Sequence, residues 1–135
     1  MGVIDELIRE DNNTVSFGNY ELATKSKVED FLHLGDLYKV KTFNEITKLE
    51  KNGMFLYESV PGTAVFDFEE SDDGITFKVE GNKDAQITVG LAESTEYKVN
   101  VAGHDMGVMK SNISGKLSIS VELQDAGTVE VSILK

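Results

Sequence analysis

The sequence predicts a mainly all-β protein, and three observations support this fold class. From Thr63 onward, short runs alternate apolar and polar residues, as expected when side chains point to the two faces of a strand in turn. Polar turns separate these runs at a spacing of about 8–12 residues. The connections are too short for crossover helices, so the strands cannot form a parallel sheet. We therefore expect an antiparallel β-sandwich in the C-terminal half.

One short helix is expected at the N-terminus, over Gly2–Glu10. Four apolar residues in this segment recur at a helical spacing and form one stripe: Val3, Ile4, Leu7 and Ile8. The polar run 11–13 (Asp-Asn-Asn) would end the helix. The segment Thr14–Leu22 is then expected to hold one or two strands, bent at Gly18 and Asn19.

A first hairpin is predicted around Gly35 and Asp36. These two residues separate the alternating segments 32–34 and 37–43, and glycine in first place suits a two-residue hairpin turn.

The segment 42–53 allows two interpretations. Asn52-Gly53 is a strong hairpin signal, flanked by 46–51 and 54–59. The alternative is a helix with Thr42 as N-cap, Glu45 as its capping-box partner and Gly53 as C-cap. We prefer the hairpin.

Seven strands are expected after the only proline, Pro61. Pro61 marks a boundary or a sharp corner, so we divide the chain into a hairpin-rich region 1–61, which packs on the rest, and a seven-stranded antiparallel sandwich 62–135. The expected strands centre on the following segments: 64–68, 75–79, 85–91, 97–101, a short one around Val108, 117–123 and 129–133.

Composition bears mainly on partners and location. The chain has 24 acidic and 13 basic residues, a net charge of −11. Because phosphate backbones bind through clustered Lys and Arg, nucleic acid is not an expected partner. No apolar run approaches the ~20 residues of a membrane span, and the acidic N-terminus lacks the basic start of a signal peptide. The chain has no cysteine, which suits a reducing compartment. We expect a cytoplasmic protein.

No catalytic residue and no cofactor are predicted. The chain lacks a dinucleotide-binding glycine motif, a P-loop and a nucleophile elbow. Its two histidines have no nameable catalytic partner. His104 lies in a glycine-flanked turn. His33 lies between Leu32 and Leu34 on an alternating strand, so it is expected to point away from them, toward solvent.

Acidic residues before Gly74 are weak candidates for a metal site: Asp67, Glu69, Asp72 and Asp73. Their spacing does not match the alternating ligands of a calcium loop, and a solvated turn is the preferred interpretation.

Two tyrosines, Tyr38 and Tyr57, are weak candidates for ligand binding. A sugar ring commonly stacks on an exposed aromatic side chain, and the chain has no Trp. The preferred interpretation is that these rings help to build the core.

Parts of the sequence resemble known groups of proteins. The segment 35–68 (GDLYKVKTFNEITKLEKNGMFLYESVPGTAVFDF), followed by DAQITVGL and GKLSISVEL, resembles small bacterial proteins often labelled "endosialidase". The C-terminal strands resemble immunoglobulin-like modules. The first resemblance implies hydrolysis of sialylated glycans, in which several arginines typically hold the sugar carboxylate. This chain has one arginine, Arg9, so only a symmetric oligomer could bring several together.

Three functions follow as hypotheses. The first, which we favour, is a non-catalytic structural or interaction protein that forms a homo-oligomer, with a phage-derived component as one variant. The second is a glycan- or ligand-binding module. The third is a small glycoside hydrolase.

Overall fold

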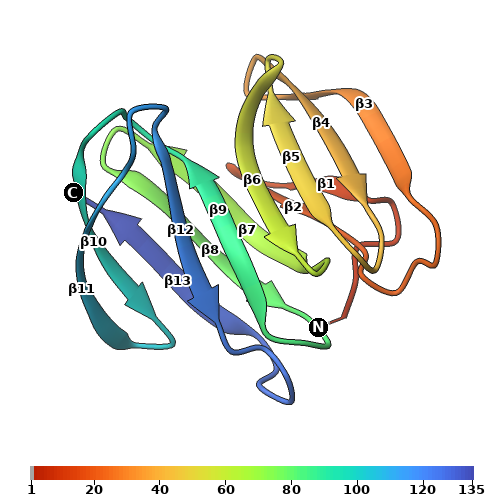
Figure 1. Cartoon of the computed structure of the whole chain (residues 1–135). Helices are drawn as coiled ribbons and strands as arrows, with labels where there is room; N and C mark the ends of the chain where they lie inside the picture. Colours follow the sequence, from red (N-terminus) through yellow and green to blue (C-terminus); the bar gives the residue numbers. More distant parts are fainter. Residues whose placement is uncertain (1) are drawn as a thin grey trace.

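A computed structural model describes residues 2–135 as an all-β protein, with no helix in that range (Figure 1). Its 13 strands have the following bounds: β1 Ile8–Asp11, β2 Thr14–Phe17, β3 Ser26–His33, β4 Asp36–Thr42, β5 Thr47–Lys51, β6 Met54–Val60, β7 Ala64–Ser71, β8 Gly74–Glu80, β9 Ala85–Gly90, β10 Glu96–Val101, β11 His104–Lys110, β12 Lys116–Val121 and β13 Val129–Leu134.

The strands form two antiparallel sheets that pack face to face. The seven-stranded sheet has the order β1-β2-β7-β8-β13-β10-β11, and the six-stranded sheet has the order β12-β9-β6-β5-β4-β3. The seven strands expected after Pro61 are confirmed as β7 to β13. Both sheets contain strands from either side of Pro61, because β2 pairs with β7 and β6 pairs with β9. No described residue lies in a helix that could cross a membrane.

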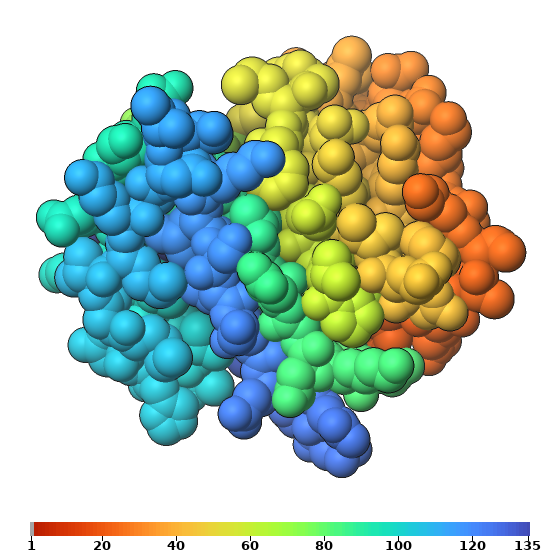
Figure 2. All heavy atoms as spheres, in the orientation of Figure 1, coloured from red at the N-terminus to blue at the C-terminus, as the bar shows by residue number. Residues whose placement is uncertain are grey.

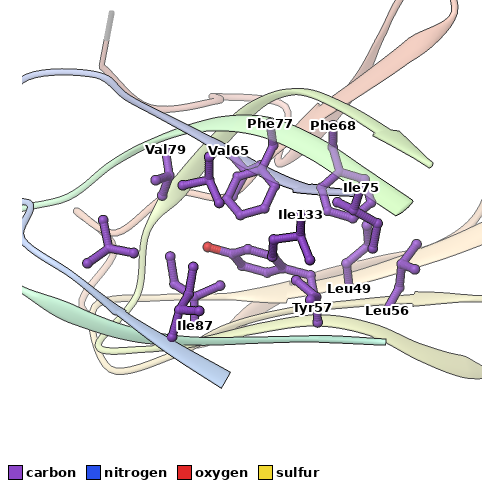
Figure 3. Close-up of a cluster of buried hydrophobic side chains, with 14 of the residues drawn as sticks. Leu49, Leu56, Tyr57, Val65, Phe68, Ile75, Phe77, Val79, Ile87 and Ile133 are labelled. Carbon is purple, nitrogen blue, oxygen red and sulfur yellow. The ribbon is translucent and has the colours of Figure 1, made fainter. Parts of the chain in front are cut away.

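The main core lies between the sheets and centres on Tyr57, which is fully buried (Figure 3). Its ring meets Phe17 and Phe77 edge-on, with ring centroids 5.3 and 5.6 Å apart, a favoured geometry for aromatic pairs. A smaller cluster packs Ile4, Tyr20, Ala64 and Phe66 together.

The predicted N-terminal helix is wrong. Leu7 has a φ of 71°, which a right-handed helix does not allow, and Ile8 begins β1, paired with Phe17 of β2. The apolar residues are instead shared between two clusters: Ile8 enters the main core and Ile4 the smaller one. The apolar residues whose spacing suggested one helical stripe therefore pack into two separate clusters.

Both predicted hairpins form. Asn52 and Gly53 connect β5 to β6, so the helix alternative for 42–53 is wrong. In the first hairpin the turn lies one residue earlier than predicted. It consists of Leu34 and Gly35, both with positive φ, and Asp36 already pairs with His33. Two positive φ values in a row give the backbone twist that a two-residue hairpin needs.

His33 is buried, so its predicted solvent orientation is wrong. A bulge in β3 around Asp30, which has a φ of 57°, shifts the register against β4. One extra residue exchanges the two faces of a strand. His33 therefore points inward and is 3% exposed, whereas Leu32 is 64% exposed. Nδ1 of His33 lies 2.6 Å from the Glu10 carboxylate on β1.

Candidate functional site

The four acidic candidates are not brought together around a common centre. Asp67 is a bulge residue of β7 with a φ of 54°, and its carboxylate lies 3.6 Å from Nζ of Lys78. Glu69, Asp72 and Asp73 are exposed along the end of β7 and the following turn. Within residues 2–135, no three His, Asp or Glu side chains gather closely enough to hold a metal ion.

The two candidate tyrosines have no open ring face. Tyr57 is fully buried, and Tyr38 is 7% exposed. The hydroxyl groups of Tyr57 and Thr63 lie 2.8 Å apart and share a hydrogen bond. Burial also raises the pKa of both phenols above its ordinary value.

Tyr20 gives a pH-dependent prediction. Burial, followed by the charge of Glu80 and the hydrogen bond to it, raises the pKa of this phenol to about 12. A phenol with a raised pKa in the folded state stabilises the fold below its ordinary pKa of about 10, and this contribution is lost as the pH rises toward 12. We therefore expect stability to fall between about pH 10 and pH 12. The free energy of unfolding, measured by urea unfolding across this pH range, checks the prediction. A Tyr20→Phe variant whose stability falls as steeply would contradict this assignment.

The single arginine is held by a neighbour on its own strand. Nε of Arg9 donates to both oxygens of Asp11, at 3.2 and 3.1 Å. A hydrogen bond from the Ser16 hydroxyl, together with Arg9, holds the pKa of Asp11 below its ordinary value. Arg9 therefore already has a carboxylate partner on its own chain.

Three of the four sheet edges carry features that discourage pairing with another chain. β1 has only four residues and is charged. β3 contains the bulge at Asp30 and the charged residues Lys27 and Glu29. β12 presents Lys116 and two serines to solvent. Short length, charge and bulges are the usual protections of an edge strand.

The fourth edge, β11, is the candidate functional site. Six of its seven residues are exposed, and the seventh, Met109, packs partly against the core. Met106 and Val108 are 55% and 60% exposed. One side of β11 pairs with β10, and no strand of residues 2–135 pairs with its other side. β11 therefore lies at a free edge of its sheet (Figure 1). It carries charged residues, as the other edges do, and its register is irregular, but it alone among them exposes two apolar side chains.

The sequence indicated this strand only weakly, as a short one around Val108. Gly107 has a φ of 87°, and the register against β10 shifts between Lys98 and Asn100. The irregularity hides the alternation that identifies the other strands. The useful signal was the pair Met106 and Val108, apolar residues with no place in a one-sided core pattern.

Comparisons with known proteins add no relative. No protein-family model matches this chain. No curated protein and no solved structure matches it either. The geometry of the described residues is therefore the basis for assigning a function.

Proposed function

We propose that this protein is a non-catalytic structural subunit that self-associates through β11. The single observation that carries the proposal is the apolar exposure of β11. All four edges carry charged residues, and β11 also has a register shift, but only β11 exposes two apolar side chains, Met106 and Val108, beside an unpaired backbone edge. An exposed apolar edge is a template for pairing with another strand.

The partner that fits is a second copy of the chain. Two β11 strands can pair antiparallel about a two-fold axis, so that the same surface is used twice and the assembly closes as a dimer. Pairing would satisfy the free backbone groups of both edges and cover Met106 and Val108. The seven-stranded sheets of the two copies would then become continuous.

Changing Val108 to Lys is expected to convert the dimer to a monomer. A lysine on this edge would have to be buried against the second copy, and edge lysines are a natural device against such pairing. Light scattering coupled to size-exclusion chromatography, at micromolar concentrations, should give twice the 14.8 kDa chain mass for the wild type and one chain mass for the variant.

The matched control is Val60→Lys, because Val60 is 53% exposed but lies at the end of the interior strand β6. This control should remain a dimer. A wild-type protein that is monomeric over the whole concentration range would overturn the proposal, and so would equal loss of the dimer in both variants.

A further inference from the structure

The sandwich is open at the end where β6 and β9 diverge. A cleft of about 400 Å³ lies there, lined by both sheets. In Figure 1 the start of β6 and the end of β9 splay apart at the top, and Figure 2 shows a notch there between the yellow side chains of β6 and the blue ones of β12. We call this site the end cleft. Its apolar and aromatic lining includes Phe55, Leu56, Ile75 and Tyr97. Its charged lining is mixed in sign, with Lys51, Lys116 and Lys135 beside Glu70 and Asp72.

The floor of the end cleft combines apolar side chains with one hydroxyl group that accepts a hydrogen bond but donates none. Leu56 and Ile75 are 3% and 0% exposed, and Tyr97 is 2% exposed. The Tyr97 hydroxyl accepts a hydrogen bond from the Ala92 N–H at 3.1 Å. No side chain or carbonyl of residues 2–135 accepts the proton of this hydroxyl. Because a buried donor without an acceptor is costly, Tyr97 offers a directed O–H to a molecule in the cleft.

The rim contains charges of both signs, and Lys116 is a lysine there without an acidic partner among the described residues. Nζ of Lys51 is paired with the Glu70 carboxylate, so this lysine is already neutralised. Nζ of Lys116 instead lies 4.7 Å from the centre of the Phe55 ring, and no carboxylate of the described residues forms an ion pair with it. In a chain of net charge −11, an unpaired lysine beside a cleft marks a place where an anion gains a partner.

We propose that the end cleft binds a small organic carboxylate that also carries hydroxyl or carbonyl oxygens. The carboxylate would pair with Lys116, and a second oxygen would accept the Tyr97 proton. The apolar floor would cover the carbon skeleton, which is the usual composition of a small-molecule site: mostly apolar walls with a few placed polar groups. The end cleft is separate from the β11 edge, so binding in the cleft can be tested independently of self-association.

The test is an NMR titration of ¹⁵N-labelled protein with D-glucuronate, which has one carboxylate and several hydroxyls. D-glucose, which lacks the carboxylate, is the control probe. The Ala92 amide is a built-in reporter because it donates to Tyr97. We expect saturable shifts at Ala92 and Lys116 with glucuronate and at least about tenfold weaker binding of glucose, as expected for the loss of one charge-assisted contact.

Two variants assign the contacts. Tyr97→Phe and Lys116→Gln should each weaken glucuronate binding about tenfold. Lys83→Gln, at the turn before β9 and therefore at the opposite end of that strand, should leave it unchanged. If Tyr97→Phe disturbs the fold, Lys116→Gln still decides the matter. Absence of saturable shifts, or equal weakening by Lys83→Gln and Lys116→Gln, would overturn the proposal.

Discussion

Replacing Tyr57 with alanine is expected to lower the free energy of unfolding by about 3–5 kcal/mol, as for other large aromatic side chains removed from a core. Tyr57 is fully buried and touches the rings of Phe17, Phe68 and Phe77. All three neighbours lie on the seven-stranded sheet, opposite Tyr57 on the six-stranded sheet, so its loss would leave a cavity between the sheets (Figure 3). Urea unfolding followed by circular dichroism measures the effect.

The matched variant Tyr57→Phe separates packing from hydrogen bonding. It keeps the ring and removes only the hydroxyl, which shares a hydrogen bond with Thr63. Thr63 retains the Ser59 hydroxyl at 2.8 Å, so we expect a loss of about 1 kcal/mol. Equal losses in the two variants would show that the ring contributes little, contrary to the packing seen here.

The fold class was predictable because the core pattern is regular. In β9, β12 and β13, and in β8 from Ile75 onward, buried and outward residues alternate without interruption. Such alternation indicates a strand with one buried face. The turn at Asn52 and Gly53 was predictable for a different reason. Both residues have positive φ, and few other residue pairs adopt that conformation at low cost.

The sequence predictions are wrong or weak where one residue breaks the alternation of buried and outward side chains. At Asp30 a bulge turns His33 inward, and near Gly107 another irregularity obscures β11. A bulge depends on pairing with the neighbouring strand, so local sequence cannot locate it. The helix prediction for the N-terminal segment is wrong for a related reason. Its apolar residues contact strands distant in sequence, such as Phe66 beside Ile4, and tertiary packing overrode the local helical spacing.

The candidate sites were less predictable than the fold. The β11 edge is defined by the missing neighbour strand and by the exposure of Met106 and Val108, and both depend on topology. The end cleft brings together Phe55, Tyr97 and Lys116 from three strands of two sheets. The tyrosines singled out from the sequence, Tyr38 and Tyr57, are both buried. Tyr97 begins the predicted strand 97–101, its ring lies in the core, and nothing in the sequence indicates that its hydroxyl lines a cleft.

Replacing Gly18 with alanine is expected to destabilise the protein by about 3 kcal/mol, because backbone strain and a steric clash add together. Gly18 has a φ of 101°, and an added Cβ would lie 2.3 Å from the Thr63 carbonyl oxygen. That oxygen cannot move freely, because it accepts a hydrogen bond from the buried Thr47 hydroxyl at 2.9 Å. The clash would therefore reach the network that holds Tyr57 through Thr63.

Gly127→Ala is the matched control for this prediction. Gly127 also has a positive φ, of 67°, but no atom of residues 2–135 lies within 4 Å of an added Cβ. Its replacement should cost only the left-handed backbone strain, about 1 kcal/mol. The difference between the two variants in urea unfolding then isolates the contact with Thr63. Equal destabilisation of the two variants would contradict the prediction. It would mean that the connection between β6 and β7 shifts to accommodate the added methyl group, so that the network around Thr63 is not rigid.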